Sequence, residues 1–389
     1  MARIYELSSL RPVMPSKKSS AVRHFSKDDI ASVADLYRRV FMPQRREPHL
    51  LLQASLEQYF YEIFFAGPWF AGPWQDEYLK SLVCVDAQDR ITGFVAVVPR
   101  RMLFKERPIL MANSFHFMAD PDRPALAGVQ LMKALLAGPQ DLTFTDHGGD
   151  LGRKVWDGLG GMTALAQSFN WVRWLRPATY ANQMAQARGA KVALAARAVR
   201  PVCAAADWLL PRVWPRWSDI SVLDWRESEL DAATLSKAHE QFAAPYALRP
   251  DGEIKTLHWL LQRAGRFPQL GRLQKVALRD VSGKLVGSFV YYLNTQGTSR
   301  VLHLAAQPDA FESVLQHLFR HATQRGALAL SGRLDPRWMR AMTNQHCRFD
   351  GAGGWTMVHA HDPEILQAIN RGEAWLSRLE GEGCLLYQE

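Results

Sequence analysis

Hydrophobic and polar positions alternate in patterns that predict both strands and helices along most of the chain. Two runs rich in β-branched and apolar residues flank a polar turn between Leu82 and Val98, as in an antiparallel hairpin. A strand from about Leu110 to Met118 follows, and after a short polar loop an amphipathic helix runs from Gly128 to Leu136. Helical patterns also precede the hairpin, from Ser26 to Phe41 and from about Leu50 to Phe65. We therefore predict an α/β fold with a mixed sheet (α+β).

The order of these elements repeats in the second half of the chain. A second hairpin pattern covers Val276 to Tyr292, and its Gly287 stands where Gly93 stands in the first hairpin. A strand, a helix from Pro308, a further strand and a short helix then follow in the same order as before. An internal duplication with an offset of roughly 190 residues explains the repeat. It predicts a flexible tail over 1–20, a first domain over 21–180, a basic, Trp-containing linker over 181–217 and a second domain over 218–389.

Positive charge is concentrated in the predicted linker. The chain of 389 residues has a formal net charge of +9. Between Arg173 and Arg216 lie eight Lys or Arg residues and one acid, Asp207, so this segment alone carries +7. Such a field favours anionic partners: nucleotide phosphates, an acidic carrier protein, RNA or a lipid surface. At about 100° per residue, the basic residues of a helix over 187–217 scatter around its circumference. We therefore expect a buried or bridging linker, with peripheral membrane contact through 187–217 as the alternative.

Other features of the composition narrow the class of protein. Apolar residues make up 48% of the chain, which excludes disorder. Four cysteines lie far apart without a CxxC pair, which suits free thiols in a reducing, cytoplasmic compartment. The N-terminal residues lack the apolar core of a signal peptide, and no uncharged apolar run approaches the ~20 residues that span a bilayer. His317 and His321 lie four positions apart on a predicted helix without a third ligand, so we expect no metal.

The loop between the strand that ends near Met118 and the following helix reads Asp-Pro-Asp-Arg-Pro-Ala-Leu-Ala-Gly from Asp120 to Gly128. Small residues there let backbone amides approach a phosphate, and the N-terminus of a helix favours negative charge. A later helix stops at Gly158-Leu-Gly-Gly161. Together with the hairpin, this order of elements resembles the GNAT superfamily of acyl-CoA N-acyltransferases. The resemblance covers nearly the whole chain, as two tandem GNAT-like domains.

The resemblance implies a donor site in the first domain, with acyl-CoA or acetyl-CoA as the donor substrate. The family's loop reads Arg or Gln and then Gly-x-Gly or Gly-x-Ala, and here Arg123 stands for the Arg. In the second domain, Ala305 to Ser313 contains neither Arg nor Gly before its helix. We therefore expect the second domain to be an inactive copy with a structural or acceptor-binding role. The predicted donor-binding residues are Met118, Arg123, Ala125, Leu126, Ala127, Gly128 and Val129.

Three residues of the first domain are candidates for proton transfer. The family's frequent general acid is a Tyr on the late helix, but Trp156 occupies the nearest aromatic position here, and an indole cannot titrate. Asp146 and His147 leave the strand after the donor helix, where either could deprotonate an amine. His116 lies on the strand before the loop, where family enzymes often place a Glu.

These features lead to three hypotheses about function. The first is an N-acyltransferase that moves an acyl group from CoA, or from an acidic acyl carrier protein, to a small amine acceptor in the cleft between the domains. The second is an aminoacyl-tRNA-dependent transferase resembling the FemAB group, which the duplication and the positive charge also fit. The third is a non-catalytic pair of GNAT-like domains that acts as a binding or scaffold protein. The first is our leading hypothesis, with no nucleic acid among its expected partners.

Overall fold

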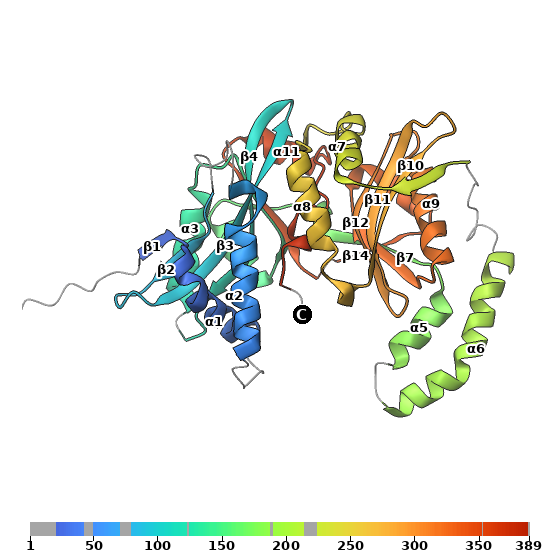
Figure 1. Ribbon diagram of the computed structural model, residues 1–389, viewed down its shortest axis with the longest axis horizontal. Coiled ribbons are helices and arrows are strands. Elements are labelled where there is room, and N and C mark those ends of the chain that lie inside the picture. Colours follow the sequence, from blue (N-terminus) through green and yellow to red (C-terminus); the bar gives the residue numbers. More distant parts are fainter. Residues whose placement is uncertain are drawn as a thin grey trace, which may run out of the picture.

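Two β-sheets stand side by side, and helices cover them (Figure 1). The computed structural model describes residues 21–42, 50–70, 79–122, 124–186, 190–213, 224–351 and 353–387. The predicted tail over 1–20 and Arg123 lie outside these residues. We call residues 21–176 unit one and residues 224–387 unit two. The alternation of helices and strands confirms the predicted α/β class with mixed sheets.

Unit one contains the helices and the hairpin that the sequence predicts. The helix expected from Gly128 begins earlier, at Pro124, because the fixed φ angle of proline suits the first turn of a helix. The elements are β1 (Ala21–His24), α1 (Ile30–Phe41), α2 (Leu50–Phe65), β2 (Leu82–Val85), β3 (Ile91–Phe104), β4 (Arg107–Ala119), α3 (Pro124–Leu136), β5 (Leu142–Gly148), α4 (Asp150–Gly158), β6 (Met162–Thr163) and β7 (Phe169–Trp174).

Unit two repeats this order and adds a short strand that pairs with β3 of unit one. Its elements are β8 (Arg226–Glu229), α7 (Ala232–Gln241), the added strand β9 (Leu248–Pro250), α8 (Ile254–Ala264), β10 (Arg272–Arg279), β11 (Leu285–Leu293), β12 (Thr298–Ala306), α9 (Phe311–Gln324), β13 (Ala329–Arg333), α10 (Met339–Asn344), β14 (Arg348–Gly351), β15 (Trp355–Ala360) and α11 (Pro363–Asn370).

The matching glycines of the two hairpins have the same structural role. Gly93 pairs with Ala119 across β3 and β4, and Gly287 pairs with Ala306 across β11 and β12. A Cβ atom on Gly93 would come within 2.8 Å of the Leu131 side chain on α3. A Cβ atom on Gly287 would collide with Val314 on α9. In both units the missing side chain lets the helix pack directly on the sheet.

The two units exchange their last strands. The first sheet has the strand order β1-β2-β3-β4-β5-β15-β6, so β15 of unit two lies between β5 and β6 of unit one. The second sheet has the order β14-β7-β13-β12-β11-β10-β8, so β7 of unit one lies between β13 and β14. The registers are reciprocal, because Leu142 pairs with Ala360 in one sheet and Ala329 with Trp174 in the other. The domain boundaries predicted from the sequence divide the two copies of the repeat. They do not divide the two sheets, because each sheet contains a strand from the other copy.

Residues 177–213 form a helical arm that stands away from both sheets (Figure 1). Helix α5 (Pro177–Gln186) packs along helix α6 (Ala190–Val213). Of the two expected forms, a buried or a bridging linker, the buried one is wrong, because most described side chains of α6 are exposed. Proline and alanine make up much of α6, and too few large apolar residues face inward to bury it against the sheets. Among the described residues, no helix is long and apolar enough to cross a membrane.

The strand exchange can be tested by splitting the gene within the segment 214–223. We expect the two halves to copurify when they are expressed together and to unfold in one cooperative transition, because each sheet needs a strand from the other half. Either half alone should aggregate, since an unpaired strand is left exposed. Size-exclusion chromatography and urea unfolding measure both outcomes. A first half that is folded and monomeric by itself would contradict the exchange.

The close approach of α3 to β3 predicts the effect of Gly93→Ala. We expect the free energy of unfolding in urea to fall by about 1–3 kcal/mol, because the new methyl group overpacks the interface with Leu131. Gly152→Ala on α4 is the matched control, since a Cβ atom there meets nothing within 4 Å. That change should raise stability by up to about 1 kcal/mol through helix propensity. Equal effects at the two positions would exclude the packing role.

Candidate active site between the two sheets

Strands β4 and β5 separate at their carboxyl ends and leave an opening in the first sheet. They pair in parallel only from Met111↔Leu142 to Asn113↔Phe144, whereas β4 continues to Ala119 and β5 to Gly148. In the second sheet, β12 and β13 pair only from Thr298↔Ala329 to Arg300↔Ser331. Backbone groups beyond these pairs need other hydrogen-bond partners, so each opening can receive another segment or a ligand.

The C-terminal segment, residues 373–387, runs through both openings. In the second sheet, the Leu379 backbone N–H donates to the Leu302 carbonyl on β12 at 3.0 Å. In the first sheet, the Asn113 side chain donates to the Glu380 carbonyl at 3.2 Å. Further along, the Tyr59 hydroxyl donates to the Leu385 carbonyl at 2.6 Å. The segment therefore takes over hydrogen bonds that strand pairing would otherwise make.

A buried ion pair joins equivalent positions of the two units. Asp146 lies four residues after Leu142, the first residue of β5 to pair with β4, and Arg333 lies four residues after Ala329, its counterpart in β13. The Arg333 guanidinium donates to the Asp146 carboxylate, and their side chains are only 6% and 0% exposed. Burial by itself would raise the pKa of Asp146, but the Arg333 charge and a hydrogen bond from His147 hold it well below its usual range. Asp146 is therefore a fixed anion.

His147 is the accessible member of this group. Its Nδ1 lies 3.2 Å from Asp146 Oδ1, and 35% of its side chain is exposed. Burial lowers its pKa, but the hydrogen bond to Asp146 and the carboxylate charge outweigh burial and raise the pKa above 6.5. A hydrogen bond from Nδ1 to a carboxylate fixes the ring and leaves Nε2 as the basic nitrogen. His147, and not Asp146, is thus the residue that can accept a proton.

Glu382 on the C-terminal segment completes the cluster. One of its carboxylate oxygens accepts hydrogen bonds from the Thr145 hydroxyl at 2.6 Å and from the Asp146 backbone at 2.7 Å. Burial and the Asp146 charge raise the pKa of Glu382 to about 7. Ligand atoms of Asp146, His147 and Glu382 lie within 4.8 Å of one another, close enough to share a metal ion. Arg333 already places a fixed positive charge against Asp146, which disfavours a second cation there.

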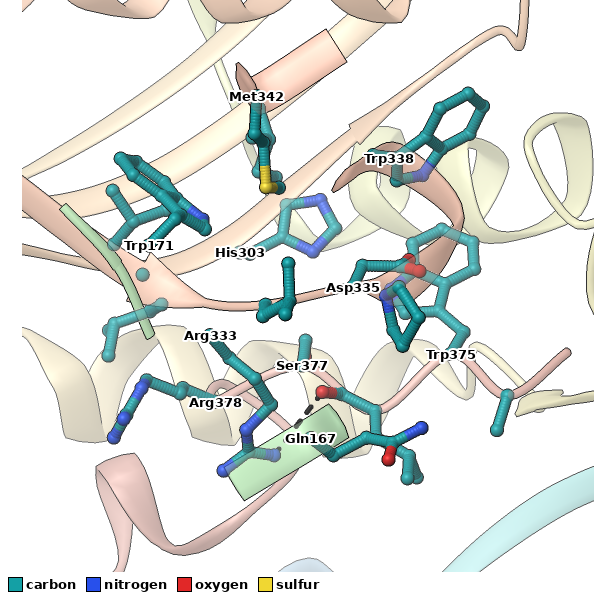
Figure 2. Close-up of a pocket in the computed structure, with 18 of the residues that line it drawn as sticks. Gln167, Trp171, His303, Arg333, Asp335, Trp338, Met342, Trp375, Ser377 and Arg378 are labelled. Carbon is teal, nitrogen blue, oxygen red and sulfur yellow. Dashed lines mark hydrogen bonds between the residues drawn. The ribbon is translucent and has the colours of Figure 1, made fainter. Parts of the chain in front are cut away.

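A cavity in the opening of the second sheet lies directly beside this cluster. It has a volume of about 50 Å³, enough for one or two water molecules. Figure 2 shows Arg333 and Arg378 toward one end of the cavity and Trp338 toward the other. Asp335 lies in the wall, where burial raises its pKa to about 6, although a 2.6 Å hydrogen bond from a tyrosine hydroxyl opposes the shift. The cavity therefore combines two cations, one weak acid and aromatic rings.

Similarity to known proteins lies in the fold and not in the sequence. No family model and no curated protein matches this chain. A protein of Enterococcus faecalis V583 described as a probable N-acyltransferase is 11% identical over 88% of this chain and 73% of its own, with a TM-score of 0.55. A GCN5-related N-acetyltransferase of Anabaena variabilis ATCC 29413 gives the same coverage, 88% and 73%, at 11% identity and a TM-score of 0.55. This chain has the GNAT fold. A GCN5-related N-acetyltransferase of Kribbella flavida also resembles it, at 11% identity over 89% of this chain and 72% of its own, with a TM-score of 0.51.

The donor loop predicted from the sequence lies between β4 and α3. Met118 and Ala127 are buried in the core, Val129 is half-buried, and a Cβ atom on Gly128 would lie 3.2 Å from the Phe117 ring. These side chains therefore pack α3 on the sheet, and among the described groups the backbone amides of the first turn remain for an anion. Ala125 and Leu126 lie in that turn, whereas Arg123 falls outside the described residues.

The matching turn in unit two is less suited to a phosphate. Helix α3 has no acidic residue in its first turn, but α9 begins with Phe311 and Glu312. The Glu312 carboxylate accepts hydrogen bonds from Asn344 and Gln345, which keep it beside the start of α9. A fixed carboxylate at a helix N-terminus repels a second anion. This difference agrees with the expectation that the donor site belongs to unit one.

His116 is held in a position that a free substrate cannot reach. Its Nε2 lies 2.6 Å from the Tyr59 hydroxyl, and burial lowers its pKa to about 3. The residue adopts φ of +46° at an irregularity where the β3–β4 register shifts, as expected for a β-bulge. His303 occupies the equivalent place on β12 and lines the cavity, with no hydrogen-bond partner for Nδ1 among the described residues. This geometry argues against His116 as the base.

Sequence reasoning did not connect three residues of the site with Asp146, although Arg333 stood out as a possible anion-binding residue at a strand end. Arg333, Arg378 and Glu382 lie far from Asp146 in the chain, and no short motif connects them. Arg333 could have been found from the duplication, because aligning the two copies places it opposite Asp146. Glu382 follows the last strand of the repeat and has no counterpart in unit one, so no sequence signal pointed to it.

The ion pair predicts a large loss of stability for Asp146→Asn. Removing the carboxylate leaves Arg333 buried without its partner, which should lower the free energy of unfolding by about 3–5 kcal/mol at neutral pH. Because the folded-state pKa of Asp146 lies below its ordinary value of 3.8, the difference from the unaltered protein should shrink as the pH falls below 3.8. Urea unfolding across a pH series measures both effects.

The matched control is Glu364→Gln, which removes the carboxylate of an exposed ion pair. Lys105 and Glu364 lie 2.8 Å apart, and their side chains are 59% and 60% exposed. Solvent screens such a pair, so the change should cost less than about 1 kcal/mol. If Asp146→Asn lowers the free energy of unfolding by no more than the control does, the buried ion pair does not stabilise the contact between the two units.

Proposed function

We propose that this chain is an acyltransferase that moves an acyl group from acyl-CoA, or from an acyl carrier protein, to an amine. The observation that carries the proposal is the pairing of an exposed His147 with a buried, permanently charged Asp146 beside the opening between β4 and β5. A carboxylate that fixes an imidazole is a common way to orient a general base. The GNAT fold of the chain agrees with this chemistry.

The reaction assigns a role to each part of the site. The donor's phosphates lie against the backbone amides at the start of α3, where the helix dipole favours negative charge. The amine nitrogen of the acceptor attacks the thioester carbonyl, so that a C–N bond forms and the C–S bond breaks. His147 takes the proton from the amine, and the thiolate leaves and is protonated to the thiol. Asp146 stabilises the imidazolium that forms, and Arg333 keeps Asp146 in place.

The acceptor is placed in the cleft between the units, at the cavity beside Arg333. Asp335, ionised above a pKa of about 6, attracts a cationic amine, and Trp338 and Trp375 supply aromatic faces for it. The cavity of about 50 Å³ is smaller than an amine substrate, so the acceptor has to displace part of its wall. The wall residues Trp375, Ser377 and Arg378 belong to the C-terminal segment.

One observation favours a second candidate, a non-catalytic binding protein with the same fold. Residues 380–385 of the C-terminal segment occupy the opening between β4 and β5, where Glu382 and Leu385 are buried. If this segment stays in place, a donor thioester has no access to that opening. Binding of a donor, tested with acetyl-CoA and with an acyl carrier protein, separates the candidates, since the first requires one of the two donors and the second requires neither.

The proposal predicts a specific loss of activity in His147→Gln. We expect kcat for the release of CoA from acetyl-CoA, with a panel of small amines as acceptors, to fall by about 10²–10⁴-fold. Acetyl-CoA binding, measured by calorimetry, should be unchanged. Because a base must be neutral, the activity of the unaltered protein should rise with pH through a pKa above 6.5, and this limb should disappear in the variant.

His24→Gln, on the exposed first strand, is the control and should change neither kcat nor the pH profile. An unchanged rate and pH profile in His147→Gln would remove His147 from the mechanism and leave positioning as the main source of catalysis. Failure of the unaltered protein to bind both acetyl-CoA and an acyl carrier protein would favour the non-catalytic candidate.

A further inference from the structure

The helical arm presents an apolar surface that no described part of the protein covers. The face of α6 toward α5 carries the less exposed side chains at helical spacing: Ala193, Ala196, Cys203, Asp207 and Leu210. The opposite face carries Leu194, Val202 and Leu209, which are 71%, 67% and 45% exposed. Trp208 is 59% exposed beside them. Single exposed apolar residues are ordinary, but several on one face of a projecting helix mark an interaction site.

The charges of α6 are all of one sign at its described surface. Its single acid, Asp207, accepts hydrogen bonds from the Ala178 and Thr179 backbone at 2.9 and 2.8 Å, so its charge caps the start of α5. The exposed charges that remain among the described side chains of α6 are Arg197, Arg200 and Arg212. The apolar face is therefore bordered by cations.

The helix geometry places two of these cations at one edge of the apolar face. With about 100° per residue, Leu194, Val202 and Leu209 fall within roughly 80° of the circumference. Measured from Leu194, Arg212 falls at about the same angle and Arg197 about 60° away on the side opposite Val202, whereas Arg200 falls about 120° away, toward α5. The Arg212 guanidinium carbon also lies 3.6 Å from the centre of the Trp208 ring, so a cation and an aromatic side chain stack on each other beside the apolar face. The basic residues of this segment were expected to scatter around the helix. The three described arginines instead lie within about one third of its circumference.

These features select one kind of partner. A second copy of the chain would bring like charges together along the same helix face. A nucleic acid would neutralise the arginines but leave the apolar face in water. An anionic lipid surface satisfies both, because apolar side chains enter the boundary of the acyl chains while cations meet the phosphates.

We propose that α6 lies on an anionic membrane surface. Leu194, Val202 and Leu209 point into the lipid, and Arg197 and Arg212 contact the headgroups. The arm stands away from both sheets, so the rest of the molecule does not obstruct this contact (Figure 1). The inference is independent of the proposed acyltransferase activity, because no residue of the candidate active site lies on α6.

Sedimentation of the full chain with lipid vesicles tests the proposal. We expect binding to phosphatidylcholine vesicles that contain about 30% phosphatidylglycerol, weaker binding to pure phosphatidylcholine, and a loss of affinity between about 50 and 300 mM salt. The triple variant Leu194→Ser/Val202→Ser/Leu209→Ser should bind at least about tenfold more weakly. Replacing Arg197 and Arg212 by Gln should weaken binding by roughly fivefold for each arginine at low salt, whereas Arg200→Gln should weaken it less.

Matched controls remove exposed residues of the same kind from other surfaces. Leu165→Ser/Ile254→Ser/Val281→Ser changes three apolar side chains that are 59%, 52% and 73% exposed. Arg272→Gln/Arg340→Gln/Arg371→Gln removes three exposed arginines. Neither control should change the affinity for anionic vesicles by more than about twofold, beyond the small non-specific effect of net charge.

A fluorescence measurement keeps the test independent of the multiple variants. An environment-sensitive dye on Val202→Cys, in a Cys203→Ser background, should shift to the blue with anionic vesicles, whereas the same dye on Val281→Cys should not. No shift and no sedimentation would overturn the proposal. A dimer that forms without vesicles and is abolished by the apolar triple variant would also overturn it. RNA binding that depends on the arginines alone would overturn it as well.

Discussion

The reciprocal exchange of β7 and β15 is the constraint on which the rest of the structure depends. Each strand lies between two strands of the other unit, so neither sheet is complete without both halves of the chain. A strand in that position has both edges hydrogen-bonded, and removing it would expose two unpaired strands at once. The exchange therefore fixes the two units relative to each other more firmly than surface packing would. It also brings the carboxyl ends of β5 and β13 close enough for Asp146 to meet Arg333.

The pairing of equivalent positions explains how one duplicated sequence came to hold one asymmetric site. Two copies of an acid, or two copies of a base, would repel each other at the place where the units meet. The chain has Asp146 in one copy and Arg333 in the other, and the same divergence places His147 opposite Leu334. The result is one buried anion with one accessible imidazole beside it, rather than two equal halves. Burial makes the arrangement rigid, because either charge alone would be costly in that environment.

The C-terminal segment connects the two openings and controls the space within them. It donates to β12 through Leu379, accepts from Asn113 on β4 through Glu380, and reaches β5 through Glu382. The same segment supplies Trp375, Ser377 and Arg378 to the wall of the cavity. The same segment therefore limits the access of a donor to the first opening and of an acceptor to the second. Glu382, whose pKa is raised to about 7 by burial and by Asp146, makes that stretch sensitive to its charge state near neutral pH.

The sequence by itself determined the class of fold, the duplication and most of the helices and strands, because these follow from local periodicity and from turn residues. Gly93 and Gly287 could be matched as a pair for the same reason, and Asp146 and His147 could be selected because they follow a predicted strand. Only the tertiary structure decided which strands pair, since β7 and β15 pair with strands that lie far from them in the chain. It also decided that Arg333 and Glu382 surround Asp146, that His116 is closed off by Tyr59, and that α6 is exposed. These outcomes depend on contacts between residues far apart in the chain, and such contacts leave no periodic signal in a single sequence.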